Sequence, residues 1–485
     1  MASQLTTLRQ LAAIINENVE ILEGLAASKG ISHPTLDSIY NSASPEEQFT
    51  RLPEVLDASL LAISAASQLV NTLKLPGAAI YERATCYHIP GALRIATDIC
   101  AVELLRDAGP EGMHVKDIAA KTGTEASMIS RALRLLAAHY IFKEVTPDVF
   151  ANNRLSSILD TGKDVGYLMT LLKDIVGNPT GEHAISRVNA KKFINTNGIA
   201  ALVDLSVDYG FKNASFVPDV FINKIDKSAF QVAHGAEKPF WEFCETHPAH
   251  LQRFQVAMGG WRTMQSPDSI FKGFGWSSLP ENSVVVDVGG GNGSVSFEIA
   301  QVAPQIKVVV QDRAQTIENI TVPTWEADAE KKIMVESGRV TLEGQDFFES
   351  QVIKRDVAVF FLRFVLHNWS FEENVKIMKR LHEAAISGTK LVIIDQIAPY
   401  ACHVKDETGA IRPQVIPNPP PILLANLGEG NPIVYRTDFV MHALIQAREW
   451  PLGEFEGMTK EAGWKIESIY QTRGTAMSVI VCGKL

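Results

Sequence analysis

The chain has 485 residues, of which 46% are hydrophobic and 21% charged, and its formal net charge is −10. A chain of this length and apolar content can bury a large core and is expected to form about three domains at ~150 residues each. The acidic balance argues against a polyanionic partner such as nucleic acid or an acidic membrane surface. Its five cysteines are far apart and include no CxxC pair, which predicts neither a disulfide framework nor a zinc site and favours a reducing, cytoplasmic location.

Residues 1 to about 110 are predicted to be almost entirely helical. Apolar residues recur at helical spacing in "LTTLRQLAAIINENVEILEGLAA" and "LPEVLDASLLAISAASQLVNTLKLP". The stretch "IPGALRIATDICAVELL" is apolar on most of its circumference, which predicts one buried helix. No uninterrupted apolar run reaches membrane-spanning length and no export signal is visible, so we expect no membrane partner.

The segment "VKDIAAKTGTEASMISRALRLLAAHYIFKEVTPDVFANN" is expected to form a helix, a glycine turn, a second helix and a hairpin, the order of a winged helix. A winged helix can bind DNA. Residues 85–155, however, contain eight basic and eight acidic residues, and the second helix offers only Arg131 and Arg134. DNA binding requires a basic face, so a dimerisation module is the favoured interpretation.

Residues 161–282 are predicted to be a helical linker and substrate-pocket region, following a helical and winged-helix dimerisation domain over 1–160. From Ser283 the pattern changes to short apolar strands alternating with helices, which predicts an α/β, doubly wound, Rossmann-like domain over 283–485. Ligands of such sheets bind beyond the carboxyl ends of the strands. Residues that directly follow strands are therefore the candidates for binding and catalysis.

The first strand end is "VVVDVGGGNGS", where Gly289, Gly291 and Gly293 allow a tight turn and a close approach of backbone to ligand. The dinucleotide fingerprint would place glycine or alanine where Ser294 stands, which weakens an NAD reading. The loop fits the D-x-G-x-G-x-G pattern of S-adenosylmethionine (SAM) enzymes, in which Asp287 can orient the loop or the methionine ammonium. A glycine loop can also serve helix–strand packing alone.

The next two strand ends carry acids. Asp312 lies 19 residues beyond Gly293 and is placed to accept hydrogen bonds from a ribose diol, as either NAD or SAM would require. Asp346 could accept from an adenine amine while Phe347 covers the base, although an acidic turn followed by a core phenylalanine is an equal alternative.

The stretch "VLHNWS" ends an apolar strand on His367, and Asp395 follows the next apolar strand 28 residues later. Both side chains are therefore expected in one crevice. A carboxylate beside a histidine fixes its tautomer and stabilises its protonated form, as a general base requires. A histidine that shares a crevice with a glycine loop and a carboxylate is more often functional than structural.

With these motifs in order, the chain resembles the SAM-dependent O-methyltransferases of the plant and fungal small-molecule type. The resemblance covers most of the chain and rests on "RALRLLAAHYIFKEV", "KPFWEF", "RFQVAM", "VVVDVGGGNG", "VVVQDR", "GQDFF", "FLRFVLHNWSFEE", "LVIIDQ" and "AREWPLGEFEGMTKEAGW". It implies that SAM is the cofactor and that the substrate is small and aromatic, such as a phenolic polyketide. The mostly helical N-terminal region is too apolar to stand alone, which predicts a homodimer. No metal is expected to be required, because the base and the pocket shape can hold one aromatic hydroxyl and the sequence shows no cluster of hard oxygen ligands.

The resemblance assigns roles to single residues. His367 matches the family's general base, Asp395 matches one flanking acid, and Glu449, 82 residues beyond His367, matches the other. The remaining matches are cofactor-contacting positions, Asp312, Asp346, Phe347 and Arg363, and substrate-pocket positions, Met258 and Met441.

Departures from the family pattern are expected to matter locally. Glu449 stands in Glu-Trp-Pro where the family usually has Glu-Arg-Thr, so the turn there can differ. The proline-rich loop after Tyr400 is longer than in plant members and resembles the fungal branch, and its prolines predict a surface flap. Residues 180–226 resemble an insertion without a family counterpart.

Three rival functions stay open at this stage. An NAD-dependent oxidoreductase is disfavoured by Ser294 and by the His367, Asp395 and Glu449 set. A winged-helix DNA-binding regulator is disfavoured by the balanced charge. Some fungal members of the family bind SAM yet catalyse dehydration or pericyclic rearrangement, and retention of all three base-site residues favours methyl transfer over that alternative.

Overall fold

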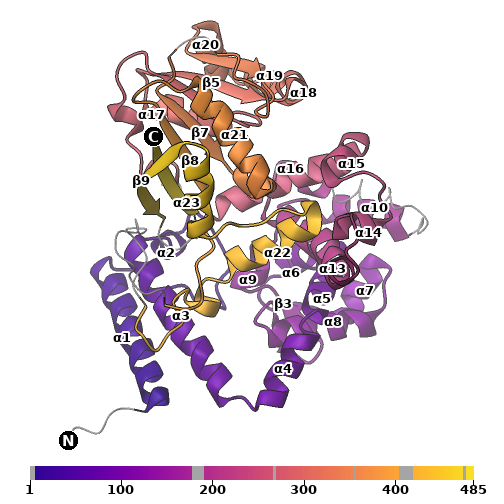
Figure 1. The fold of residues 1–485 in the computed structure, drawn as a ribbon. Helices are drawn as coiled ribbons and strands as arrows, with labels where there is room; N and C mark the ends of the chain where they lie inside the picture. The colour runs from indigo at the N-terminus through magenta and orange to yellow at the C-terminus, as the bar shows by residue number, and fades with distance from the viewer. Residues whose placement is uncertain (1–5, 177–190, 266–268, 354–355, 404–418, 473–476) are drawn as a thin grey trace, which may run out of the picture.

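The computed structural model describes residues 6–176, 191–265, 269–353, 356–403, 419–472 and 477–485. A helical region formed by the first half of the chain lies against an α/β region that contains a seven-stranded sheet (Figure 1). Both predicted classes of structure are therefore present, in the predicted order along the chain.

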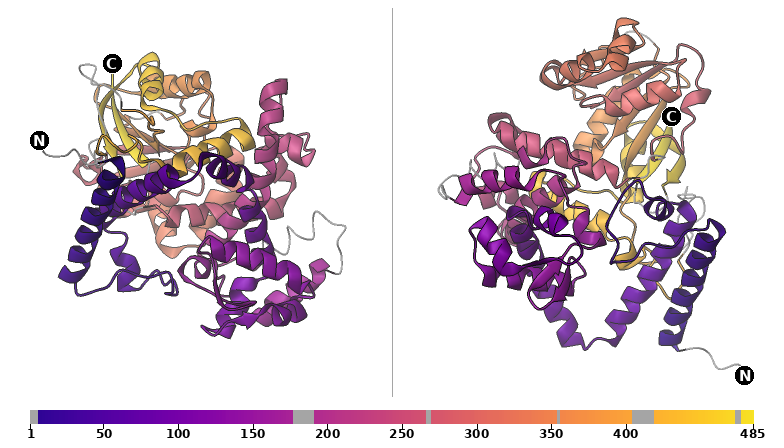
Figure 2. Two further views of the ribbon diagram at one scale, coloured as in Figure 1. Left: turned by 90° about the horizontal axis from the view of Figure 1, so that it is seen from below. Right: turned by 180° about the vertical axis from the view of Figure 1, so that it is seen from behind.

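The chain begins with a pair of long helices packed side by side, α1 (Thr7–Ser28) and α3 (Pro53–Leu73), with the short α2 (Pro45–Phe49) between them in sequence (Figures 1 and 2). Within the described residues α3 is long and apolar enough to cross a membrane by length and composition alone. In the structure it packs on α1 and on the segment before α22, where Leu11, Ala65, Leu423 and Leu427 share one apolar cluster. The next helix, α4 (Pro76–Thr85), buries none of its side chains in the single chain.

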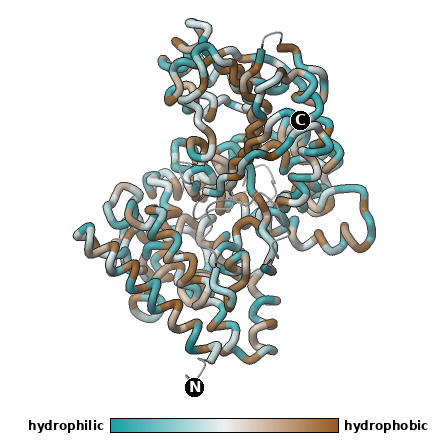
Figure 3. The backbone as a smooth tube through the Cα atoms, turned by 60° about the vertical axis from the view of Figure 1, so that its left-hand side comes forward, coloured by the Kyte–Doolittle hydropathy of each residue, from teal (hydrophilic) through white to brown (hydrophobic). Residues whose placement is uncertain are grey.

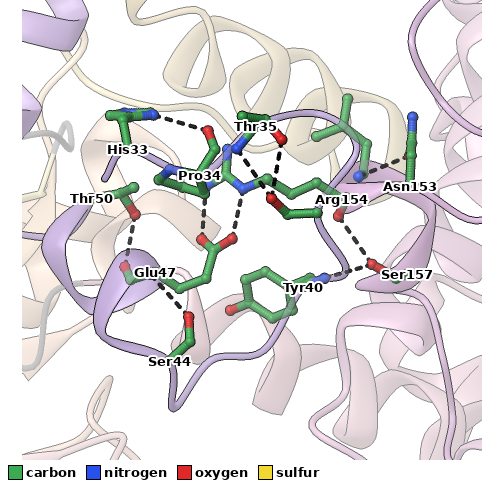
Figure 4. Close-up of polar contacts among 12 residues, drawn as sticks. His33, Pro34, Thr35, Tyr40, Ser44, Glu47, Thr50, Asn153, Arg154 and Ser157 are labelled. Carbon is green, nitrogen blue, oxygen red and sulfur yellow. Dashed lines mark hydrogen bonds and ion pairs between the residues drawn. The ribbon is translucent and has the colours of Figure 1, made fainter. Parts of the chain in front are cut away.

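The loop between α1 and α2 and the residues of α2 dock on the winged-helix domain (Figure 4). The Arg154 guanidinium donates from Nε and Nη2 to the two carboxylate oxygens of Glu47, at 2.6 and 2.7 Å. The Arg154 amide donates to the Leu36 carbonyl at 3.0 Å, and the Tyr40 amide donates to the Ser157 hydroxyl at 2.8 Å. Glu47 is 4% exposed, so this ion pair is largely removed from water.

Replacing Arg154 with methionine is expected to lower the free energy of unfolding by about 3 kcal/mol, because it leaves the Glu47 carboxylate buried without a counter-charge. The free energy of the first transition in urea unfolding measures the effect. The matched control is Arg436→Met, whose ion pair with Glu429 is exposed and should contribute less than ~1 kcal/mol. Equal losses in the two variants would contradict a structural role for the buried pair.

The winged-helix domain is confirmed. Its three-stranded sheet has the order β1-β3-β2 and packs with α7 and α8. The Arg134 guanidinium on α8 forms ion pairs with Glu144 and Asp148 on the wing, so its charge is paired within the domain. The elements are α5 (His88–Asp98), α6 (Ala101–Ala108), β1 (Met113–His114), α7 (Val115–Thr122), α8 (Ala126–Ala138), β2 (Lys143–Thr146), β3 (Val149–Ala151) and α9 (Arg154–Ser157).

The prediction of one continuous helix over "IPGALRIATDICAVELL" was wrong. The helix breaks between α5 and α6, where Cys100 adopts a left-handed conformation with φ 57°. The Thr97 carbonyl at the break accepts from the Cys100 amide at 3.1 Å and from the ammonium of the buried Lys192 at 2.8 Å. Because Lys192 is 92 residues away from Cys100, the local pattern could not reveal this break.

Helices continue through the middle of the chain. The segment 180–226, predicted as an insertion, lies outside the described residues up to 190, and from 191 onward its described part is mostly helical. A Cβ on Gly260 of α16 would lie 2.2 Å from the Gly198 carbonyl oxygen, so α12 and α16 cross in direct backbone contact. The elements are α10 (Val165–Val176), α12 (Ile199–Leu205), the π-helix η1 (Ser206–Gly210), α13 (Phe211–Asn223), α14 (Ala229–His234), α15 (Phe240–Thr246) and α16 (Pro248–Thr263).

The predicted strands form one sheet in the order β6-β5-β4-β7-β8-β10-β9. The first five strands of this order are parallel, and β10 is antiparallel to both β8 and β9. In Figure 3, segments of hydrophobic residues run through the sheet. The strands are β4 (Val284–Val288), β5 (Lys307–Asp312), β6 (Val340–Gly344), β7 (Val359–Arg363), β8 (Lys390–Gln396), β9 (Trp464–Gln471) and β10 (Met477–Lys484).

Helices cover both faces of the sheet, as a doubly wound fold requires. Helices α21 and α23 pack on one face through Val375, Leu381 and Phe455, and α17, α19 and α20 contribute Ile299, Trp325 and Met334 to the core of the other. The helices are η3 (Trp276–Ser278), α17 (Ser294–Val302), α18 (Ala314–Thr316), η4 (Ile317–Thr321), α19 (Val322–Glu326), α20 (Ala329–Glu336), η5 (Leu366–Asn368), α21 (Phe371–Ala384), η6 (Gly428–Gly430), α22 (Ile433–Ile445) and α23 (Leu452–Glu461).

One helix of the C-terminal segment returns to the helical region. Leu444 on α22 is buried in a cluster with Tyr209, Phe230 and Phe240, so α22 packs with η1, α14 and α15 (Figure 1). The chain then re-enters the sheet domain through a parallel bridge between Ile397 and Trp450. This path brings residues on either side of α22 to the carboxyl edge of the sheet.

Candidate active site

The glycine loop follows β4 and begins α17. Gly289, Gly291 and Gly293 have φ values of 74°, 55° and 72°, which explains glycine at these positions, since L side chains rarely adopt this conformation. A Cβ on Gly293 would lie 2.6 Å from the Trp325 ring nitrogen, whereas a Cβ on Gly291 would meet nothing within 4 Å. The loop is thus closely packed at its helix end and open at Gly291.

Asp287 lies under this loop. Its carboxylate is 3% exposed, and one oxygen accepts a hydrogen bond from the Ser296 hydroxyl at 2.6 Å. Burial raises the pKa of Asp287 to about 7, although the Ser296 hydrogen bond opposes the shift. The side chain therefore ties the loop to the first turn of α17.

The acids predicted at the ends of β5 and β6 line the same edge of the sheet. The Gly291 amide donates to the Asp312 carboxylate at 2.9 Å, and the Arg313 amide donates to its other oxygen at 2.8 Å. Asp346 is exposed and accepts from the Phe348 amide at 2.9 Å. The half-buried ring of Phe347 packs edge-on against Trp369, with 5.7 Å between ring centroids, and lies close to Gly289.

His367 sits on a tightly held turn after β7. Phe364, three residues earlier, has φ 53°, a strained value for a bulky side chain and typical of functional sites. The turn is fixed through the Leu366 carbonyl, which accepts from the Asn374 amide group at 2.8 Å and from the Trp450 ring N–H at 3.1 Å. Ser370 then caps α21, so the turn ends where the helix begins.

The two predicted acids meet His367. Strands β7 and β8 are hydrogen-bonded neighbours, which confirms the predicted adjacency, but only His367 follows its strand, since Asp395 is the penultimate residue of β8. The His367 Nδ1 lies 3.1 Å from Glu449 Oε1, a hydrogen-bond distance. Asp395 and Glu449 are 1% and 2% exposed, and the second oxygen of each has no hydrogen-bond partner among the described residues.

At this cluster, burial and the neighbouring charges shift each pKa in opposite directions. Burial alone would lower the pKa of His367, but the charge of Asp395 and the hydrogen bond to Glu449 outweigh it, so the pKa is raised above 6.5. Burial raises the pKa of Asp395 to about 7, while His367 opposes the shift. The two shifts are therefore linked, because the charge of each group stabilises the charged form of the other.

The three side chains also form a set of possible metal ligands. One ligand atom each from His367, Asp395 and Glu449 lies within 4.8 Å of the others. The same atoms are equally arranged for hydrogen bonding, because the imidazole N–H donates and a carboxylate only accepts. Activity in the presence of a chelator distinguishes these two uses.

The remaining predicted residues lie on three elements. Arg363 ends β7, and its Nη2 donates to Gln265 Oε1 at 2.9 Å. Met258 lies on α16 and is 37% exposed, and Met441 lies half-buried on α22.

Sequence reasoning missed the residues that hold the predicted ones in place. Gln396 donates from Nε2 to Glu449 Oε1 at 3.3 Å, and Asn374 and Trp450 hold the turn that bears His367. Gln396 directly follows Asp395 at a strand end, a position that could have identified it. Gln265 follows α16 without any motif and gave no signal.

The residues at this edge fit the adenosyl and methionine parts of SAM. The open glycine at 291 permits close approach of a ligand to backbone, and the half-buried Asp312 carboxylate lies beside it. Buried N–H groups on Gln265 and Arg363 have no partner within the described chain, so the site has donors left for a ligand.

This fold and this edge define an α/β enzyme of the methyltransferase class. A family model for an O-methyltransferase domain matches residues 217–415, and one for an O-methyltransferase dimerisation domain matches residues 81–162. The chain is 35% identical over 482 residues to 4-O-methyltransferase 1 of the fungus Phanerochaete chrysosporium, covering 96% of each chain. The protein belongs to the O-methyltransferase family, is an enzyme, and uses SAM as its cofactor.

Two solved structures illustrate the fold. The mitomycin 7-O-methyltransferase MmcR is 19% identical, with a TM-score of 0.57, over 87% of this chain and 98% of its own. A structure described as a pericyclic reaction enzyme is 15% identical, with a TM-score of 0.60, over 96% of this chain and all of its own. At these identities the likeness concerns the fold alone, and both reaction types occur on it.

Proposed function

We propose that the enzyme transfers the methyl group of SAM to a hydroxyl, most simply a phenol, of a small aromatic or polyketide metabolite, with His367 as the general base. The observation that supports this proposal is the buried contact of His367 with Glu449 beside Asp395, at the sheet edge that carries the glycine loop. A cytoplasmic location and a homodimer are part of the proposal. The dimerisation-domain match and the exposed Leu75, Ile80 and Tyr81 on or next to α4 support the dimer.

The contact with Glu449 supports the tautomer of His367 that base catalysis needs. A carboxylate accepts but does not donate, so the proton of the neutral ring is on Nδ1, facing Glu449, and Nε2 carries the free lone pair. Nε2 would take the proton from the acceptor hydroxyl as the oxygen attacks. The charges of Asp395 and Glu449 then stabilise the imidazolium that forms.

SAM, when bound, supplies an already activated methyl group. A phenol with a pKa near ~10 is ionised to about one part in a thousand at neutral pH, so a placed base contributes roughly 10²–10⁴-fold. The His367 side chain is only 12% exposed, which keeps the proton transfer away from bulk water. Met258 and Met441 would form apolar walls that hold the ring of the substrate.

Transfer of radiolabelled methyl from SAM to a panel of phenols and aromatic acids tests the proposal. We expect label in at least one phenol, with the rate unchanged within twofold by EDTA, because the base and not a metal activates the hydroxyl. Loss of transfer on chelation and its return with Zn²⁺ or Mg²⁺ would contradict the base mechanism and assign the cluster to a metal. An acceptor that is dehydrated or rearranged without gaining label would overturn methyl transfer itself.

A further inference from the structure

Gln396, the last residue of β8, donates to both of the acids that lie beside His367. Its backbone N–H donates to Asp395 Oδ1 at 3.0 Å, and its side-chain Nε2 donates to Glu449 Oε1 at 3.3 Å. Gln396 is 3% exposed, so both hydrogen bonds are shielded from water. The proposed proton transfer does not itself use Gln396, so its buried amide needs a separate explanation.

The fold places Gln396 beside Glu449. Ile397 and Trp450 form a parallel bridge, and the Ala398 amide donates to the Trp450 carbonyl at 3.0 Å. Gln396 and Glu449 each precede this bridge by one residue, so their side chains start from neighbouring backbone positions. Backbone pairing therefore brings together two residues that are 53 positions apart in the sequence.

One oxygen of Glu449 is contacted from two sides. Oε1 lies 3.1 Å from His367 Nδ1 and 3.3 Å from Gln396 Nε2, whereas Oε2 has no partner among the described residues. The terminal torsion of a glutamate is broad, so a hydrogen bond to His367 alone would leave the carboxylate free to turn and present either oxygen. The amide N–H of Gln396 selects Oε1 and carries no charge, so it orients the acid without neutralising it.

The hydrogen bond that a histidine ring makes determines which of its nitrogens bears the proton. We infer that Gln396 is a positioning residue: by fixing Glu449, it keeps the proton of the neutral His367 ring on Nδ1 and leaves Nε2 as the acceptor. The effect of Gln396 on the rate rests on the proposed base mechanism. Its effect on the ring proton is a property of the enzyme without substrate and can be measured separately.

Gln396→Met removes the amide while keeping a side chain of similar length, and it tests the inference. We expect kcat for methyl transfer to fall about tenfold, as for one lost hydrogen bond to a charged group, while the KM for the acceptor and the Kd for S-adenosylhomocysteine stay within about twofold. Nitrogen-15 NMR of enzyme labelled at histidine reports the ring proton at alkaline pH, where His367 is neutral. The His367 signals, identified by their absence in His367→Ala, should change from the Nδ1–H form toward a mixture of both forms.

The matched control is Gln255→Met, the same substitution at an exposed position of α16, which should change neither the rate nor the NMR signals. Gln396→Asn keeps the amide but shortens its reach by one carbon, so it should give a smaller change of the same kind. It replaces Gln396→Met if that variant does not fold. If Gln396 acts through Glu449, adding Gln396→Met to Glu449→Gln should slow the enzyme no further than Glu449→Gln alone.

Two results would overturn the inference directly: an unchanged His367 tautomer in Gln396→Met, or rate losses that multiply in the double variant. A loss of affinity for S-adenosylhomocysteine as large as the loss in kcat would overturn it too, because that pattern indicates a damaged site. If the tautomer changes but His367→Ala keeps the parent rate, the positioning role of Gln396 holds and the proposed base mechanism fails.

Discussion

Replacing His367 with alanine is expected to lower kcat for methyl transfer at least a hundredfold while the affinity for S-adenosylhomocysteine stays within about twofold. The loss follows from removing the group that accepts the hydroxyl proton, a contribution of roughly 10²–10⁴-fold. The cofactor contacts lie at the ends of β4, β5 and β6, so they should remain intact. Single-turnover rates with saturating SAM measure the chemical step directly.

The pH dependence of the His367→Ala rate shows whether the variant has lost a base or has lost the shape of its site. Without His367 the reaction needs the ionised phenol, so the rate of the variant should rise about tenfold per pH unit toward the phenol pKa near ~10. His442→Ala is the matched control, because His442 is exposed on α22 next to Met441. A His367 variant that retains more than a third of the parent rate at neutral pH would contradict the base assignment.

The sheet domain was predictable because its signals are local. Strands β4, β5, β7 and β8 are short apolar runs, and helices stand between β4 and β5 and between β7 and β8, which favours parallel pairing. The neighbouring positions of His367 and Asp395 followed from the same reasoning, since adjacent parallel strands end at one edge. Periodicity and strand order therefore located two of the three residues of the candidate cluster, His367 and Asp395.

Long-range contacts were not predictable from pattern. Glu449 was named only by resemblance, because it reaches His367 through the excursion of α22 into the helical region and the bridge of Trp450 to Ile397. The break at Cys100 is contacted by Lys192, a residue far along the chain. In both cases the deciding contact lies outside any window in which periodicity can be read.

The fold also explains why the site combines buried charge with strain. Asp287 and Asp395 are the penultimate residues of the buried strands β4 and β8, and burial there raises the pKa of both to about 7. The left-handed Phe364 turns the chain sharply after β7, and this turn places the His367 ring over the same edge. Strain and desolvation at one edge are the features that distinguish a functional crevice from a packed sheet end.

Replacing Asp395 with asparagine is expected to lower kcat/KM about tenfold to a hundredfold at pH 8 and to move the acidic limb of its pH profile down by about one unit. His367 must be neutral to accept a proton, so activity rises as pH passes through its pKa. The charge of Asp395 raises that pKa, and removing the charge lets burial lower it. The plateau falls because the imidazolium formed during transfer loses a stabilising charge.

Two matched variants show whether loss of charge causes the change in the pH profile. Asparagine keeps the oxygen that accepts from the Gln396 amide at 3.0 Å, and Glu449→Gln keeps an acceptor for His367 Nδ1, so both preserve shape while removing charge. Asp395 has a pKa of about 7, so the acidic limb of the parent enzyme's pH profile reflects the coupled ionisation of His367 and Asp395. The profile of Asp395→Asn should instead follow a single ionisation. A limb that stays in place or moves to higher pH in Asp395→Asn would contradict this account of how the buried acids set the base.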